Sequence, residues 1–180
     1  MRKSNKKNEL LSLRNTLREE SKDTANNVFM TDSKIRAIDF DNVKLCYSKI
    51  YIPSEEGIHS VDSILYGKDY SNNDLKEYFI EFKNGDFHTK EILEKAKDSL
   101  LIMGDLENRT ISYTRKNAVF MLVYNEKVKQ PASRDYIHVH GIHDRAHKKY
   151  APFGLTPLFL YFSDVLVKTA DEFDFFMRKI

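Results

Sequence analysis

The chain has 180 residues, enough for one domain with a substantial core, and 41% of them are hydrophobic, as in a globular protein. No apolar run approaches the roughly 20 residues of a membrane-spanning helix, and no apolar secretory segment follows the basic first residues. We therefore expect a cytoplasmic protein with no membrane partner. The single cysteine, Cys46, excludes an internal disulfide, and the net charge of +2 permits a nucleic-acid partner without requiring one.

The first third of the chain gives a mixed signal. Residues 1–7 are basic and polar, which predicts a disordered tail before the folded domain. Leucines at helical spacing predict an amphipathic helix over residues 8–20. Residues 34–51 follow neither the helical nor the strand period and could form either element. Residues 53–57 have turn chemistry and lead into the next segment.

Two strand-like runs in the middle of the chain carry charged side chains. Residues 61–66 and 78–83 are both apolar, are separated by a polar link, and are stopped by Gly85. Asp62 interrupts the first run, and Glu81 and Lys83 interrupt the second. Because side chains alternate along a strand, Glu81 and Lys83 share one face, and a hairpin would bring Asp62 beside Glu81. Buried carboxylates need compensation, and a divalent metal is the usual one when two converge.

The rest of the chain predicts a helix, a strand and a terminal helix. The helix begins near Thr89 and ends near Gly104, with one apolar stripe made of Ile92, Leu93, Ala96, Leu100 and Leu101. Residues 117–124 form a continuous apolar run that suits a central strand, and residues 158–168 contain further strand-like stretches. Thr169 and Glu172 fit a capping box that starts the last helix.

The pattern of Asp62, a gap, and then Glu81-Phe82-Lys83 resembles the signature of the PD-(D/E)xK nuclease superfamily. The resemblance covers roughly residues 55–105, and Val61 stands where the family has Pro. It implies a restriction-endonuclease-like α/β fold, with a central mixed β-sheet flanked by helices. It also implies a metal-dependent nuclease that binds Mg²⁺ or Mn²⁺ through Asp62, Glu81 and the backbone carbonyl of Phe82. Lys83 would orient or activate the attacking water, and the partner would be nucleic acid, with DNA as our expectation.

Other interpretations of the same residues stay open. Glu81 and Lys83 could instead form the solvated face of an edge strand, paired for a few tenths of a kcal/mol. The same fold could also serve as a non-catalytic module that binds nucleic acid or protein, because fold alone does not establish activity. In the family a third carboxylate often comes from an N-terminal helix, and Glu9, Glu19 and Glu20 are the candidates.

Four of the six histidines lie within ten residues of one another near the C-terminal third: His138, His140, His143 and His147. On a strand, the first two would point the same way and could share a metal. No cysteine lies nearby, and we favour a polar surface segment. The basic groups Arg115-Lys116, and Arg145 with Lys148-Lys149, are candidate phosphate contacts, although solvated surface is the more common role of such groups.

Overall fold

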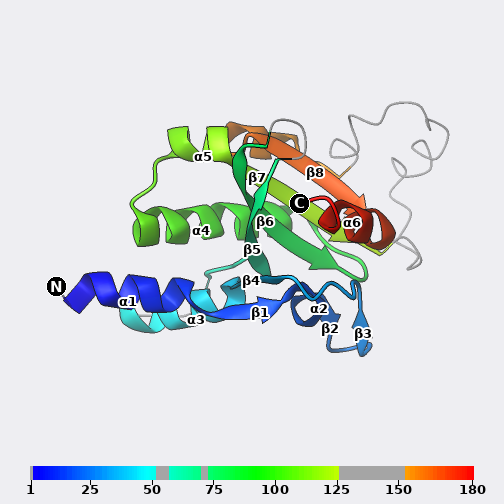
Figure 1. Ribbon diagram of the computed structural model, residues 1–180, viewed down its shortest axis with the longest axis horizontal. Helices are drawn as coiled ribbons and strands as arrows, with labels where there is room; N and C mark the ends of the chain where they lie inside the picture. The colour runs from blue at the N-terminus through cyan, green and yellow to red at the C-terminus, as the bar shows by residue number, and fades with distance from the viewer. Residues whose placement is uncertain (1, 52–56, 70–72, 126–152) are drawn as a thin grey trace.

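Apolar strand sequences with period two or with continuous hydrophobic runs build one mixed sheet at the centre of the structure (Figure 1). The computed structural model describes residues 2–51, 57–69, 73–125 and 153–180. In spatial order the six strands are β1 (Arg14–Thr16), β4 (Arg36–Asp39), β5 (Ser63–Lys68), β6 (Leu75–Lys83), β7 (Ala118–Tyr124) and β8 (Asp164–Thr169). The first three pairings are antiparallel, and β6, β7 and β8 run parallel. The α/β class and the mixed central sheet expected from the sequence are confirmed.

Helices cover both faces of this sheet. The described elements outside it are α1 (Arg2–Leu11), α2 (Leu17–Glu20), α3 (Phe40–Tyr51), α4 (Thr89–Glu107), α5 (Ile111–Asn117), a 3-10 helix η1 (Thr156–Leu160), α6 (Ala170–Met177), and a small hairpin of β2 (Lys22–Asp23) and β3 (Val28–Phe29). Figure 1 shows α4 and α5 on one side of the sheet and α6 on the other. Across the described residues, no helix is both long and apolar enough to span a bilayer.

The N-terminal segment differs from the sequence expectation. Residues 2–7, expected as a disordered tail, belong to α1, and the single helix expected over residues 8–20 is divided into three elements. The division occurs because β1 pairs with β4, and the Thr16 side chain then accepts a hydrogen bond from Glu19 N to start α2. The ambiguous region 34–51 is resolved as two adjoining elements, β4 and α3, which explains why neither period fits all of it.

Strand β6 is the central strand on which the site depends. It pairs with β5 over six residues and with β7 over seven, so it is not an edge strand. Its side chains alternate between two buried layers. Phe79 packs with α1, α3, α4 and η1 in one core, whereas Tyr78, Ile80 and Phe82 pack with α6 in the other. The interpretation of Glu81 as part of a solvated edge is therefore wrong.

A second buried carboxylate lies four residues before Glu81 on the same face of β6. Glu77 is 3% exposed and pairs with Arg109, which follows α4 and also pairs with Glu107. The Tyr113 hydroxyl donates to Glu77 at 2.7 Å, and the Arg109 guanidinium carbon lies 4.6 Å from the centre of the Tyr113 ring. A buried carboxylate is thus compensated at each end of this strand by groups from the helical layer.

Helix α4 and the shorter α5 that follows it connect β6 to the parallel β7, and α4 covers one face of the sheet. Ile92, Ala96 and Leu100 are buried against the core and Leu93 is half-buried, but Leu101 is 69% exposed, so it was wrongly included in the apolar stripe. The helix also continues past Gly104 to Glu107, because the residue that ends it is Asn108 in the left-handed conformation (φ 57°). The terminal helix α6 starts with the expected capping box of Thr169 and Glu172.

Adjacent leucines on α4 provide a direct test of this packing. Leu100→Ala should lower the free energy of unfolding by about 2–5 kcal/mol, because it leaves a cavity between α4 and the sheet. The matched change Leu101→Ala removes an exposed side chain and should cost less than about 0.5 kcal/mol. Chemical denaturation of the two variants measures the difference. Similar costs for both would mean that α4 is rotated from the described orientation.

Candidate active site

Asp62 lies in a bend directly before β5, and three elements hold it there. Its backbone carbonyl accepts a hydrogen bond from Phe40 N at 3.1 Å, and the preceding amide, Val61 N, donates to Ser99 Oγ on α4 at 2.9 Å. Ser63 pairs with Ile80, so extending the register by one residue places Asp62 opposite Glu81 on the same face. The Asp62 Oδ2 atom accepts from the Phe82 amide at 2.6 Å. The strands expected to carry these groups are therefore neighbours, as predicted.

Glu81 is fully buried between the sheet and α4. Its Oε1 atom accepts hydrogen bonds or ion pairs from two lysines, at 2.7 Å from Lys95 Nζ and 3.1 Å from Lys83 Nζ. Its Oε2 atom is also buried but has no hydrogen-bond partner among the described residues. A buried carboxylate oxygen without a donor is costly, and it is an open position for a cation or a water.

Lys95 is one of two members of the site, with Glu91, that the sequence analysis did not identify. Its Nζ atom lies 2.7 Å from Glu81 Oε1 and 3.8 Å from Asp62 Oδ1, so one ammonium serves both carboxylates. Lys95 lies on α4 in phase with the buried Ile92 and Ser99, three residues before it and four after it. This spacing could have identified Lys95 from the sequence, because a lysine on the buried face of a helix needs an anionic partner.

Lys83 joins this cluster to a third carboxylate. Its ammonium lies between Glu81 and Glu91, 2.8 Å from Glu91 Oε1, and its side chain is 17% exposed. The hydrogen bond from Lys83 holds the pKa of Glu91 below its ordinary value. Glu91 lies in the first turn of α4, so this helix supplies both Lys95 and the carboxylate that holds Lys83. The structure thus brings Asp62, Glu81 and Lys83 together and adds Lys95 and Glu91.

Burial and charge act in opposite directions on these groups. Burial raises the pKa of Asp62 well above its ordinary value, and the neighbouring Glu81 raises it further, while Lys95 and the Phe82 amide oppose the shift. Burial also raises the pKa of Glu81, against the effect of the two lysines. Burial alone would lower the pKa of Lys95, but Glu81 and Asp62 outweigh it and the pKa rises. Two close carboxylates therefore favour a cation between them.

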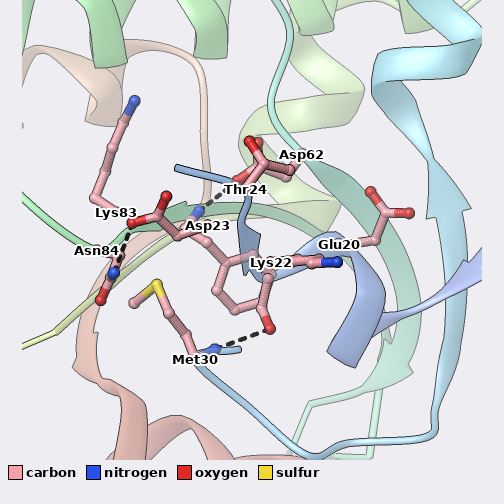
Figure 2. Close-up of a pocket in the computed structure, with 10 residues that line it drawn as sticks. Glu20, Lys22, Asp23, Thr24, Met30, Asp62, Lys83 and Asn84 are labelled. Atoms are coloured by element: carbon pink, nitrogen blue, oxygen red, sulfur yellow. Dashed lines mark hydrogen bonds between the residues drawn. The ribbon is translucent and has the colours of Figure 1, made fainter. Parts of the chain in front are cut away.

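A polar hollow of about 270 Å³ opens beside this cluster, where β6 ends and β5 begins (Figure 2). The segment from α2 to β3 forms one wall of it and contributes Glu20 and Lys22, while Asp62, Phe82 and Lys83 line the other side. Asn84 donates to Asp23 at 2.7 Å across the hollow. Two members of the charged cluster, Asp62 and Lys83, are thus accessible to a ligand from solvent.

Of the three candidates for a third carboxylate, only Glu20 lines this hollow. Glu19, its neighbour on α2, is exposed and pairs with Arg18 at 2.9 Å. Partial burial, together with Asp39 and Asp41, raises the pKa of Glu20 to about 8, although a hydrogen bond with Asn15 acts against the shift. Sequence could not separate these candidates, because the short α2 sets the direction of each side chain.

The described parts of the chain contain no three side chains of His, Cys, Asp or Glu that converge to hold a metal ion. The groups that could bind one here are the two carboxylates of Asp62 and Glu81, with main-chain oxygens nearby. The histidine cluster His138–His147 and the basic residues Arg145, Lys148 and Lys149 lie outside the described residues. Arg115 is described on α5, where its Nε donates to the Leu160 carbonyl at 2.6 Å.

Comparisons of this chain with protein-family models, with curated proteins and with solved structures found no match.

The raised pKa of Glu20 predicts a pH-dependent stability. The folded protein binds this proton more tightly than the unfolded chain does, so its contribution is fully present below about pH 4.5 and is lost as the pH rises through about 8. Glu20→Gln should remove that part of the decline, as measured by denaturant unfolding at a series of pH values. Glu19→Gln, which removes an exposed carboxylate from the same helix, controls for net charge. Parallel profiles for wild type and Glu20→Gln would contradict this account of Glu20.

Proposed function

We propose that the chain is a metal-dependent nuclease that hydrolyses phosphodiester bonds. One observation carries the proposal: Asp62, directly before β5, and Glu81 of the adjacent β6 lie on the same face of the sheet, within 4 Å of a single cationic nitrogen. Lys83 contacts the same Glu81 oxygen and lines the adjoining hollow. The order of β5, β6, α4, the short α5 and β7, in which two strands are followed by a helical crossover and a third strand, supports the resemblance to the PD-(D/E)xK superfamily, and with it a restriction-endonuclease-like fold.

The donor set fits a hard divalent cation such as Mg²⁺ or Mn²⁺, which prefers oxygen ligands. Asp62 and Glu81 would hold it with help from the Phe82 carbonyl, and the buried Oε2 of Glu81 is the oxygen that still lacks a partner among the described residues. Glu20 is the best-placed third carboxylate, since it lines the hollow with Asp62. When bound, such an ion polarises the phosphate and lowers the pKa of a coordinated water.

The lysine on β6 has the position expected of a group that acts on water or phosphate. Lys83 is anchored on one side by Glu81 and on the other by Glu91, which limits its motion. It is nevertheless partly exposed in the hollow, so its ammonium can contact an incoming phosphate or the water that attacks it. A fixed positive charge at that point stabilises the charge that develops in the transition state.

Nucleic acid, and DNA in our proposal, is the substrate class that matches these charges. Besides Lys83, the exposed Lys22 of β2 lines the same hollow, and each can neutralise a backbone phosphate. Asp23 on that wall accepts hydrogen bonds from Asn26 and Asn84, which lower its pKa to about 2 and keep it ionised, so the two lysines must outweigh its repulsion of a phosphate.

A non-catalytic binding module is the second candidate, and one observation favours it. Lys83 and Lys95 carry two positive charges against the two negative charges of Asp62 and Glu81, which balances the innermost groups without a metal. A binding protein could keep such a balanced network for structural reasons alone.

Cleavage assays on purified variants test the enzyme. Mg²⁺ or Mn²⁺ should support cleavage of DNA or RNA, and Ca²⁺ should bind without supporting it well, because it takes looser coordination than Mg²⁺. Lys83→Ala should lower the rate at least about a hundredfold while leaving metal binding largely intact. Asp62→Ala should abolish both, and Lys90→Ala, an exposed change on α4, should affect neither.

Robust cleavage by the double variant Asp62→Ala, Lys83→Ala would show that the activity comes from elsewhere. Absence of metal binding and cleavage by the wild type would favour the binding module.

A further inference from the structure

The position of Lys95 has a consequence for any cation that enters this site. Its ammonium sits between the two carboxylates, 2.7 Å from Glu81 Oε1 and 3.8 Å from Asp62 Oδ1. All three side chains are shielded from solvent, with 17% of Lys95 and 15% of Asp62 exposed and Glu81 fully buried. The lysine therefore already has the place and the charge of a cation shared by these two groups.

We propose that Lys95 is a built-in competitor for the divalent cation, which must displace its ammonium to bind Asp62 and Glu81. The inference rests on the proposed function, because it concerns the same site, and it adds a rule for when the metal can enter. Mg²⁺ needs ligand oxygens at about 2.0–2.1 Å, and with the free Oε2 of Glu81 as a ligand it would share one carboxylate group with the ammonium that now contacts Oε1. Two cations within a few ångströms in a poorly hydrated site repel each other strongly.

The two lysines of the site differ in what holds them. Lys83 has a second anchor, because Glu91 lies 2.8 Å from it as well as Glu81. Within the described residues, the ion pairs of Lys95 are only those with Asp62 and Glu81. A metal that takes these carboxylates therefore leaves Lys83 in place but leaves Lys95 without its ion-pair partners, with only the more distant charge of Asp41 to attract it. Lys95 is the group that must move, and its long side chain allows the ammonium to swing away from α4.

A displaced ammonium needs a new anion, and we expect a nucleic-acid phosphate bound beside Asp62, which lines the adjoining hollow, to supply one. Metal and polyanion should therefore bind cooperatively: each makes the binding of the other more favourable, by the same factor. In the absence of nucleic acid, Lys95 would keep metal affinity low. Lys95 would then act as a positioning residue, and its displacement would raise the affinity of the site for the metal when substrate is bound.

The test is a titration of the metal-free full-length chain with Mn²⁺, followed by calorimetry, on wild type, Lys95→Met and Lys90→Met. Lys95→Met keeps the apolar stem and removes the charge, and it should bind Mn²⁺ at least about tenfold more tightly than wild type. Lys90 is on the same helix with its side chain 86% exposed, so Lys90→Met should match wild type within about twofold. If Lys95→Met does not fold, Lys95→Gln, which keeps hydrogen-bond donors, takes its place.

A second measurement adds a phosphorothioate oligonucleotide that resists cleavage. It should tighten Mn²⁺ binding by wild type and have a smaller effect on Lys95→Met, whose competitor has been removed. The rise in melting temperature on adding Mn²⁺ should also be larger for Lys95→Met than for wild type.

The outcomes separate this inference from the proposed function. Equal or weaker Mn²⁺ binding by Lys95→Met, with clear binding by wild type, overturns the competitor and leaves the nuclease proposal intact. Binding by Lys95→Met alone supports the competitor and means that the lysine closes the wild-type site. Absence of binding by every variant overturns both proposals.

Discussion

The ion pair between the buried Glu81 of β6 and Lys95 of α4 is the interaction on which the rest of the site depends. A lone carboxylate at that depth would cost several kcal/mol, so the strand can carry it only if α4 is docked with Lys95 facing the sheet. The apolar contacts of Ile92, Ala96 and Leu100 fix that orientation. The hydrogen bond from Val61 N to Ser99 Oγ then ties the same helix to the segment that carries Asp62. Core packing and site geometry are therefore set together by one crossover helix.

The cluster fits either a metal-dependent enzyme or a non-catalytic binding module, because either a metal ion or a second lysine can compensate the carboxylates of Asp62 and Glu81. Two lysines neutralise Asp62 and Glu81 as the structure stands. A divalent ion in place of Lys95, together with Lys83 retained by Glu91, would supply three positive charges against the three carboxylates Asp62, Glu81 and Glu91. Lys83 is held by two carboxylates, Glu81 and Glu91, whereas Lys95 shares both of its partners with the proposed metal. The network is therefore suited to exchanging the Lys95 ammonium for a metal ion. This asymmetry connects the structural role of the cluster with the catalytic role that we propose for it.

Sequence predicted the strand part of the site better than the helical part. Alternation along residues 78–83 and the hairpin with residues 61–66 were enough to place Asp62, Glu81 and Lys83 together, because strand period and register are local properties. Lys95 was missed because its partners are distant in sequence, and only its phase with Ile92 and Ser99 marked it. Leu101 was misplaced because apolar character alone does not fix which side of a helix meets the sheet. Glu20 could not be chosen over Glu19, because β1 pairing interrupts the expected helix just before them.

The two carboxylates on one face of β6 also bear on which strand pairings the chain can adopt. Glu77 and Glu81 both point toward the helical layer, where Arg109 and Lys95 meet them, while the opposite face bears Tyr78, Ile80 and Phe82. A slip of one residue against β5 and β7 would turn both carboxylates into the wholly apolar layer beneath α6, away from every cation that now pairs with them. A misregistered sheet would bury two unpaired carboxylates at once, which would make it much less stable than the observed sheet. These charged groups, whatever they add to or subtract from net stability, make the observed alignment of the central strand distinct from its near neighbours.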